Sequence, residues 1–361
     1  MADPSPSHRD SAAFGRGFLR RIWHFAALSS ELKAGAIKRL TIMGEPVALG
    51  RTRSGEAFAL GDICPHRAAP LSAGRLVRES DGRESVECAY HGWRFRPDGV
   101  CAAIPSLAPG QEFDVSKVRA RAYPLAESQG LVFLWMGERA KAPDLAPPRF
   151  EGIVGRRPRL VERTIFNAHL DHAVVGLMDP AHGPFVHRQW WWRSQASMRA
   201  KAKRFEPRDE GFVMVRHPPS ANSRAYALLG GAPTTEIGFR LPSLRWEHVL
   251  AGRFQVLALT CLTPIDENST LATQIVWSDH PLFFLAGPII RLAARRFLSQ
   301  DRAMVDLQSE GLKRNPTLLW IDDADAQAKW YQALKKEWMA SRREGRSFRN
   351  PLAPTELRWV S

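Results

Sequence analysis

The sequence has few cysteines and no long apolar run, and each shortage excludes a class of protein. Four cysteines in 361 residues are too few for a disulfide-rich secreted domain, so closely spaced cysteines indicate metal or redox chemistry. The longest apolar run, residues 281–290, is about half as long as a membrane span. Residues 1–17 lack the apolar core of a signal peptide. We therefore expect a cytoplasmic protein with no membrane span.

Acidic residues are scarce relative to basic ones, and the formal net charge is +14 at pH 7. A hydrophobic content of 44% with 24% charged residues is typical of a globular protein. The cations are dispersed, with one modest concentration at residues 335–349, and no nucleic-acid-binding motif accompanies them. We therefore expect no nucleic-acid partner; an acidic protein partner explains the charge at least as well.

Turn and strand patterns divide the chain into two domains. Residues 1–18 have the composition of a disordered tail, and residues 19–140 contain short strands broken by glycine-containing turns, which predicts an all-β domain. Residues 141–150 are rich in proline and are expected to be a linker. Residues 151–361 combine long strands with a helical pattern from 285 to about 340, which predicts an α+β domain with helices on one face of an antiparallel sheet.

Two short cysteine–histidine motifs lie in the first domain, Cys64-x-His66 and Cys88-x-x-His91. Two thiolates and two imidazoles can bind zinc or a two-iron cluster. Each motif mixes one cysteine with one histidine, which suits a cluster whose thiolates hold one iron and whose imidazoles hold the other. An Asp-Gly turn between the motifs predicts a hairpin that brings them together. A zinc site remains the alternative.

A second group of candidate ligands lies in the sequence MDPAHGPFVH, which contains Asp179, His182 and His187. Two histidines five residues apart point roughly 140° apart on a regular helix, so the helix must bend or end between them to bring both to one metal. Gly183-Pro184 is expected to supply that break. Two imidazoles and one carboxylate would form the facial triad of a non-haem Fe(II) site. Alternatively, both histidines lie in the core and Asp179 caps a turn.

The two motifs together resemble those of the Rieske non-haem iron oxygenases, in particular their alpha-type oxygenase component. CPHRAAPLS and CAYHGW match the Rieske [2Fe–2S] motif, and Asp-x-x-His-x(4)-His follows at the distance seen in this family. The resemblance extends from about residue 20 to residue 340 and is closest to the homotrimeric branch of aromatic O-demethylases and monooxygenases. It implies an N-terminal all-β Rieske domain followed by a helix-grip catalytic domain.

The resemblance also implies roles for single residues. The cysteines and histidines of the first motif would hold the [2Fe–2S] cluster, and His182 and His187 would hold a mononuclear Fe(II). Asp179 would be an electron-transfer bridge to a cluster histidine, here His91, of a neighbouring subunit.

A third iron ligand must come from a carboxylate further along the chain. The family pattern selects Asp301, and Asp306 is the competitor on the same predicted helix. A rival group of His169, Asp171 and His172 precedes the motif, and we expect it to form a subunit contact.

The family resemblance implies a terminal oxygenase that takes electrons from a reduced nicotinamide through a separate ferredoxin or flavin reductase. No G-x-G-x-x-G motif is present for binding the nicotinamide itself. The reaction would be hydroxylation or O-demethylation of an aromatic substrate. The alternatives are a cis-dihydroxylating dioxygenase and, from a different class, a Rieske electron-transfer protein with no working mononuclear iron.

Two segments are candidates for the substrate pocket: Gly176 with Leu177, and the inward positions of residues 234–249. Trp190–Trp192 could line its entrance, form a subunit contact or simply pack.

Overall fold

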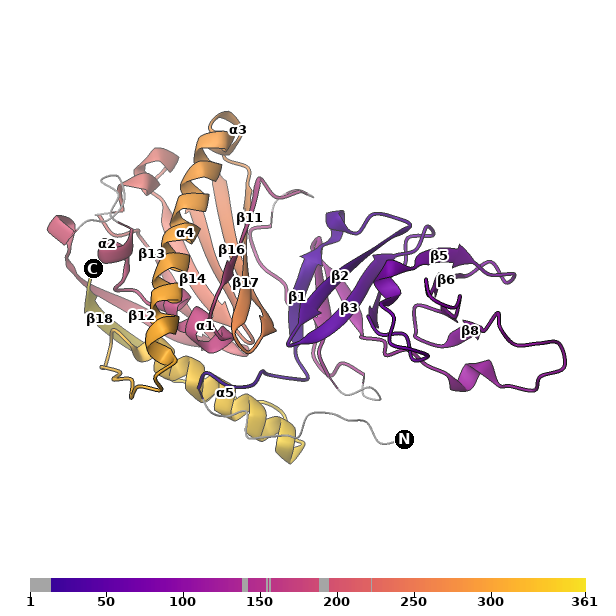
Figure 1. Cartoon of the computed structure of the whole chain (residues 1–361). Coiled ribbons are helices and arrows are strands. Elements are labelled where there is room, and N and C mark those ends of the chain that lie inside the picture. Colours follow the sequence, from indigo (N-terminus) through magenta and orange to yellow (C-terminus); the bar gives the residue numbers. More distant parts are fainter. Residues whose placement is uncertain (1–13, 138–141, 154, 156, 188–194, 222) are drawn as a thin grey trace. The chain divides into compact units, whose positions relative to one another are not determined.

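The computed structural model describes the chain except residues 1–13, 138–141, 154, 156, 188–194 and 222 (Figure 1). The described chain forms two compact units. The small unit is Arg20–Arg149, and the large unit is Phe150–Ser361 together with the described residues that precede Arg20. We describe each unit separately.

The small unit consists of three antiparallel sheets connected by turns and short 3-10 helices. In the order of neighbouring strands, the sheets are β1 (Trp23–Leu28), β10 (Leu131–Trp135) and β9 (Leu125–Ser128); β2 (Ala36–Ile42), β3 (Glu45–Arg51) and β4 (Ala57–Gly61); and β5 (Arg75–Arg78), β6 (Glu84–Glu87), β7 (Arg94–Phe95) and β8 (Cys101–Ala103). The 3-10 helices are η1 (Ser29–Glu31), η2 (Leu71–Ala73) and η3 (Val115–Lys117). The predicted all-β domain is confirmed.

Turns rich in glycine place the two cysteine–histidine motifs in one core. The predicted Asp-Gly turn joins β5 to β6, and Gly82 adopts the positive φ of 83° that this turn requires. The β7–β8 turn contains Gly99, whose Cβ would lie 2.3 Å from the carbonyl oxygen of Ala120 if it had one. Cys64 and Cys88 lie in the same buried cluster as residues from both hairpins. The hairpin therefore returns the chain to its starting point, as predicted.

The large unit is built on one eight-stranded antiparallel sheet. In sheet order its strands are β11 (Leu160–Phe166), β17 (Ser269–Ser278), β16 (Phe254–Asp266), β15 (Leu244–Ala251), β14 (Thr234–Arg240), β13 (Gly211–His217), β12 (Ala200–Arg208) and β18 (Thr355–Val360). The long strands expected in this domain are present. Strands β12 and β18 give little sequence signal because they are exposed on alternate residues and carry many charges, so neither contains an apolar run.

Helices cover one face of this sheet, and α4 runs along it in Figure 1. The helices are α1 (Leu170–Met178), α2 (Gly183–Val186), α3 (Leu282–Leu285), α4 (Gly287–Leu312) and α5 (Ala326–Glu344), with the 3-10 helices η4 (Gln195–Ser197) and η5 (Arg224–Leu229). Ile290 and Ala294 of α4 pack against apolar residues of β11, β15, β16 and β17. The predicted α+β fold is confirmed. No helix in the described part of the chain is long and apolar enough to cross a membrane.

The proline-rich segment expected to be a linker instead packs on the small unit. The indole N–H of Trp23 donates to the carbonyl of Leu145 at 2.6 Å, and the Ser128 hydroxyl donates to the carbonyl of Pro148 at 3.0 Å. These two bonds hold the segment on the sheet of β1, β10 and β9, so the compact unit extends to Arg149.

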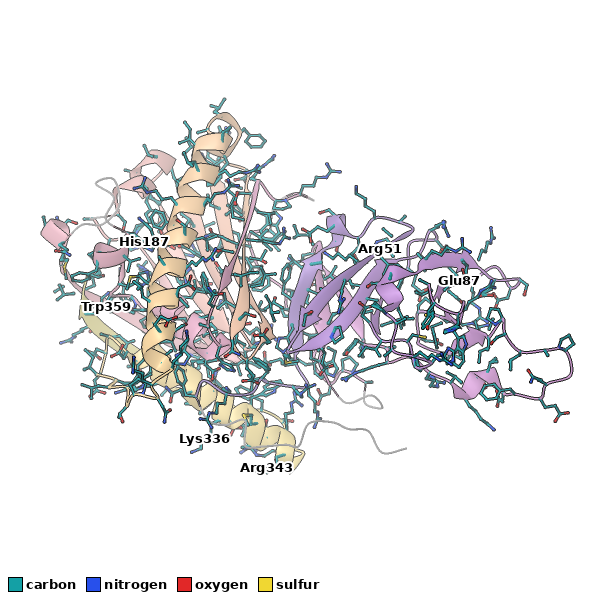
Figure 2. All side chains as sticks on the ribbon, viewed as in Figure 1. Arg51, Glu87, His187, Lys336, Arg343 and Trp359 are labelled. Carbon is teal, nitrogen blue, oxygen red and sulfur yellow. The ribbon has the colours of Figure 1, made fainter. Side chains whose placement is uncertain are left out.

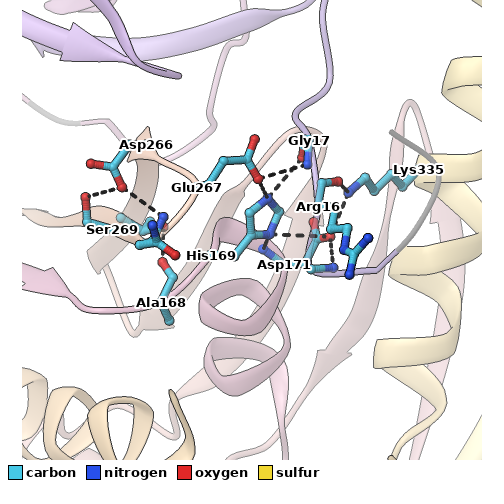
Figure 3. A network of polar contacts seen from close by, with 12 residues as sticks. Arg16, Gly17, Ala168, His169, Asp171, Asp266, Glu267, Ser269 and Lys335 are labelled. Carbon is cyan, nitrogen blue, oxygen red and sulfur yellow. Dashed lines mark hydrogen bonds and ion pairs between the residues drawn. The ribbon is translucent and has the colours of Figure 1, made fainter. Parts of the chain in front are cut away.

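The prediction of a disordered tail is wrong for residues 14–18, while residues 1–13 lie outside the described part. A buried carboxylate, Asp171 on α1, accepts hydrogen bonds from the backbone N–H of Gly15 at 2.7 Å and from the Tyr331 hydroxyl at 2.7 Å. It also accepts from the Lys335 ammonium at 2.6 Å (Figure 3). Residues 14–18 are held against α1 because a buried charge needs several hydrogen-bond partners, and Gly15 supplies one of them.

His169 and His172 hold the same segment. His169 caps α1, its Nε2 lies 3.1 Å from the carbonyl oxygen of Gly17, and its ring stacks on Phe18. His172 meets the ring of Phe14 edge-on, and burial lowers the pKa of His172 to about 4. These residues therefore bind the N-terminal segment of their own chain, and the subunit contact predicted for them stays a prediction.

Replacing Lys335 by methionine is expected to destabilise the large unit by about 3 kcal/mol or more, because Asp171 would keep a buried charge without its cation. Thermal unfolding of Lys335→Met, followed by near-UV circular dichroism, measures the loss. Lys336 is exposed and next in sequence (Figure 2), so Lys336→Met is the matched control and should unfold like the wild type. Equal stability of all three proteins would contradict the role of the Lys335–Asp171 pair.

Candidate functional site

The two cysteines of the small unit lie at the start of two loops with the same hydrogen-bond pattern. The N–H of Cys64 donates to the carbonyl of Ala69 at 2.9 Å, and the N–H of Cys88 donates to the carbonyl of Trp93 at 2.8 Å. Each cysteine therefore bonds to the residue five positions later. The two loops therefore have similar backbone structures, although the histidine is the third residue of one loop and the fourth of the other.

Both loops turn through a left-handed residue at their fifth position. Ala68 has φ 58° and Gly92 has φ 71°. Glycine adopts this conformation without strain, whereas alanine does so at a cost, so the first loop is held by its surroundings. The result is a pair of histidine rings, His66 and His91, whose centroids are 4.6 Å apart.

The side chains at the loops fit a cluster that needs two thiolates and two imidazoles. Nδ1 of His66 and Nε1 of Trp93 are buried, and neither has a hydrogen-bond partner within the described chain. Their rings stack at 4.5 Å with an interplanar angle of 4°. Buried polar atoms without partners are uncommon in native proteins. An inserted group that takes the His66 lone pair and accepts from Trp93 would satisfy both.

The thiols of Cys64 and Cys88 also favour a positively charged group bound between the two loops. Burial and, to a smaller extent, the adjacent Cys88 thiol raise the pKa of Cys64 to about 11. Such a thiol ionises at neutral pH only when a strong positive charge lies next to it, and metal ions supply that charge. Cys101 and Cys261 are buried and free, as expected for small apolar residues.

In the large unit, His182, His187 and Asp301 converge on one point. The two Nε2 atoms are 3.3 Å apart, and Oδ1 of Asp301 lies 3.1 Å from Nε2 of His187 and 3.8 Å from Nε2 of His182. The candidate ligand atoms all lie within 4.8 Å of one another. Two imidazole nitrogens and one carboxylate oxygen facing a common point are the donor set of a non-haem Fe(II) site.

The local helix geometry differs from the prediction in one detail. α1 ends at Met178, and Gly183-Pro184 begins the one-turn helix α2 instead of breaking a longer helix. Proline is favoured in a first helical turn because the N–H that it lacks has no partner there. His182 immediately precedes α2 and His187 follows it, so a short helix flanked by non-helical chain brings both rings to the same side.

Neighbouring side chains orient the two imidazoles. Nδ1 of His187 lies 3.1 Å from Oε1 of Gln300, which as an acceptor keeps the proton on Nδ1 and leaves Nε2 free for a metal. Phe297, also on α4, stacks on the His187 ring at 4.2 Å. Nδ1 of His182 is buried and lies 3.7 Å from Oδ2 of Asp179. Burial raises the pKa of Asp179 and lowers the pKa of His182, so His182 favours its neutral, metal-binding form.

Asp306 lies outside this group. Its Oδ1 accepts from the backbone N–H of Asn167 at 3.1 Å, and its Oδ2 lies 3.4 Å from Nε of Arg302. These contacts leave Asp301 as the α4 carboxylate beside the histidines.

A cavity of about 310 Å³ opens at the three converging residues. Predicted pocket positions do line it: Leu177, Thr235, Ile237, Arg245 and Glu247. Gly176 does not; its missing Cβ would lie 3.7 Å from Val305 of α4. Trp190–Trp192 lie outside the described residues.

Sequence reasoning missed several residues of the site. Gln300 and Phe297 precede Asp301 by one residue and one helical turn, and only the orientation of α4 places them beside His187. Tyr226 of η5 donates to Glu247, and Oε1 of Gln274 on β17 is buried without a partner in the described chain. No local pattern identifies these two residues, because Gln274 reaches the cavity through the order of strands in the sheet and Tyr226 through the position of η5.

Two family models match the chain. The Rieske [2Fe-2S] domain matches residues 22–124, and the vanillate O-demethylase oxygenase C-terminal domain matches residues 166–340. The two matches fall on the two units described above.

Known relatives match over different shares of their length. The 4beta-methylsterol monooxygenase of Methylococcus capsulatus (strain ATCC 33009 / NCIMB 11132 / Bath) is 32% identical over 90% of this chain and 89% of the relative. The toluene-4-sulfonate monooxygenase iron-sulfur subunit TsaM1 of Comamonas testosteroni is 41% identical, over 35% of this chain and 34% of the relative. The chain spans between 24% and 48% of four curated relatives that it matches. A structure of dicamba monooxygenase bound to 3,6-dichlorosalicylic acid superposes with a TM-score of 0.70 at 26% identity, covering 88% of this chain and 98% of the other.

A β unit with two mixed cysteine–histidine loops, followed by an α+β unit with a two-histidine, one-carboxylate group, defines the class of two-centre iron oxygenases. The two family models and the nearly full-length relative agree with that class. The chain belongs to the Rieske non-haem iron oxygenases.

Replacing Gln300 by leucine is expected to weaken iron binding by about 10- to 100-fold, because His187 would lose the acceptor that sets its tautomer and ring orientation. Fe(II) retention during dialysis against a graded chelator measures the change. Ser299 is exposed and adjacent on α4, so Ser299→Ala is the control and should retain iron like the wild type. Wild-type retention in Gln300→Leu would show that the contact does not orient the ligand.

Proposed function

We propose that this chain is the terminal oxygenase component of a multicomponent Rieske oxygenase and hydroxylates or O-demethylates an aromatic substrate. The observation that carries the proposal is the convergence of His182, His187 and Asp301 at an open cavity, in one chain with the paired cysteine–histidine loops. An electron carrier needs no such cavity.

In this proposal Cys64 and Cys88 hold one iron of a [2Fe–2S] cluster, and His66 and His91 hold the other. Imidazole ligands remove negative charge from the cluster and raise its reduction potential. The indole of Trp93 covers His66 and aims its N–H inward. Cluster binding would thus release the thiol protons, including that of Cys64, whose pKa is raised by burial.

His182, His187 and Asp301 would hold the mononuclear iron. Bound Fe(II) would supply the activation of O₂ beside the substrate. The protein's own contribution is geometry: Gln300 keeps Nε2 of His187 unprotonated, and the cavity holds the substrate against the open side of the three ligands.

Asp179 is proposed to connect the two centres across subunits of a homotrimer. Its Oδ2 faces Nδ1 of His182, and its side chain is one-third exposed in the single chain, which leaves it accessible to His91 of a neighbouring subunit. The carboxylate would bridge the imidazoles by hydrogen bonds.

The electron donor is proposed to be a separate ferredoxin or flavin reductase that oxidises a reduced nicotinamide in the cytoplasm. The excess of 51 basic over 37 acidic residues favours an acidic donor, because opposite charge accelerates encounter.

Replacing Asp301 by alanine is expected to abolish product formation, because two histidines alone hold iron weakly and leave it misplaced. Formaldehyde release from a panel of methoxy-aromatic acids, with a surrogate reductase and NADH, measures turnover; labelled O₂ and product analysis identify ring hydroxylation. Asp306→Ala is the matched control on the same helix and should remain active. If Asp306→Ala lost activity and Asp301→Ala remained active, Asp306 would be the third iron ligand in place of Asp301.

Replacing Asp179 by asparagine is expected to slow oxidation of the reduced cluster by more than about tenfold, because an amide cannot bridge two imidazole N–H groups as a carboxylate does. Stopped-flow absorbance of the cluster with O₂ and substrate measures the rate, and iron content should be unchanged. Asp325 is a neighbouring carboxylate, and Asp325→Asn should react like the wild type. Wild-type oxidation in Asp179→Asn would refute the bridge.

A further inference from the structure

Five large apolar side chains are exposed where α3 meets α4. This α3–α4 patch consists of Leu228 (70% exposed), Phe284 (55%), Leu285 (85%), Ile289 (72%) and Leu292 (68%). Leu228 belongs to η5, whose Tyr226 and Leu229 pack with Phe283 and Ile290 in one cluster, so η5 and the two helices lie together. Single exposed apolar residues are ordinary, but a contiguous group marks an interaction surface.

Part of the patch forms an apolar stripe on one face of α4. Ile289 and Leu292 are three residues apart and lie on one face of α4, and Leu285 ends α3 just before the non-helical Ala286. The sheet is covered by a different face, which carries Ile290 and Ala294. α4 crosses the sheet with α3 at its far end (Figure 1). Helix α4 therefore has two apolar faces: one packs on the sheet, and the other is exposed.

Positive charge surrounds the stripe. Residues 282–300 contain three arginines and no acidic residue. Arg296 is exposed and continues the stripe one turn beyond Leu292. Arg291 and Arg295 are exposed too, and both lie beside the single carboxylate of Glu162, which leaves a net positive charge.

A further cation lies at the tip. The guanidinium of Arg159 lies 3.7 Å from the centre of the Phe284 ring. Exposed leucine, isoleucine and phenylalanine bordered by arginine are typical of helices that lie in the headgroup region of a bilayer.

We propose that the α3–α4 patch docks on the surface of a lipid bilayer that contains anionic lipids. The apolar stripe would enter the boundary between headgroups and acyl chains, and Arg296 and its neighbours would pair with lipid phosphates. The binding is peripheral and reversible.

A second copy of this chain fits the patch less well. A symmetric contact through the stripe would place Arg291, Arg295 and Arg296 against the same arginines of the partner, which is unfavourable. The trimer contact proposed above uses Asp179 and His91, and neither lies in the patch. An anionic lipid surface satisfies both the apolar area and the charge.

Docking has a consequence for substrate, and this step rests on the proposed function. η5 contributes Leu228 to the patch and Tyr226 to the cavity, and α4 contributes Leu292 to the patch and Leu298 to the cavity. The bilayer would thus contact the elements that form the cavity, so an apolar aromatic substrate dissolved in lipid could reach the site from the membrane.

Vesicle flotation of the full-length iron-loaded protein tests the docking without measuring turnover. The probes are phosphatidylcholine vesicles with and without about 30% phosphatidylglycerol. We expect the wild type to float with the anionic vesicles, and Ile289→Ser/Leu292→Ser to partition more than tenfold less. Arg296→Gln should weaken binding at low salt. Leu319→Ser, which removes an apolar side chain 87% exposed outside the patch, should bind like the wild type.

Three outcomes would overturn the proposal. The wild type fails to float with either vesicle, the double variant floats as well as the wild type, or light scattering shows that the double variant loses an oligomer while lipid binding is absent. If the double variant does not fold, Leu285→Ser at the tip of α3 replaces it, with the same expected loss. Iron content, measured in each sample, separates this outcome from failure of the proposed oxygenase site.

Discussion

The contact between a carboxylate in the middle of α4 and two imidazoles beside α2 is the constraint on which the candidate site depends. His187 and Gln300, the residue next to Asp301, are 113 positions apart in the chain. They meet only because α4 lies along the sheet at a fixed rotation, which Ile290 and Ala294 set by packing on the strands. A rotation of one residue would move the carboxylate by roughly 100° and leave two histidines without a third ligand. The packing of α4 on the sheet therefore determines how the three candidate ligands are placed.

In the small unit, local structure brings the candidate cluster ligands together. Cys64 and Cys88 start loops with equivalent backbone bonds, and the β5–β6 hairpin returns one loop to the other. Nδ1 of His66 and Nε1 of Trp93 are buried without a hydrogen-bond partner among the described residues, which is unfavourable without an occupant. The same groups become satisfied when a cluster is bound. Binding energy and folding of these loops are therefore coupled, as in other small metal sites.

Patterns confined to a few residues were readable from the sequence, and patterns created by distant packing were not. The loops at Cys64 and Cys88, their hairpin and the histidines of α2 have local signals, because turn residues and ligand spacing are local. Asp171 looked like part of a rival metal group. Its real partners, Gly15 and Lys335, lie at opposite ends of the chain, and no spacing within α1 reveals them. Gln300 was missed for the same reason.

The most direct test of the account is the content of iron and acid-labile sulfide in protein purified without oxygen and then supplied with Fe(II). Two mixed cysteine–histidine loops and one facial triad predict about three irons and about two sulfides per chain. About two irons with two sulfides, even with excess Fe(II), would contradict the mononuclear site and favour an electron carrier. Zinc without sulfide would contradict the Rieske cluster.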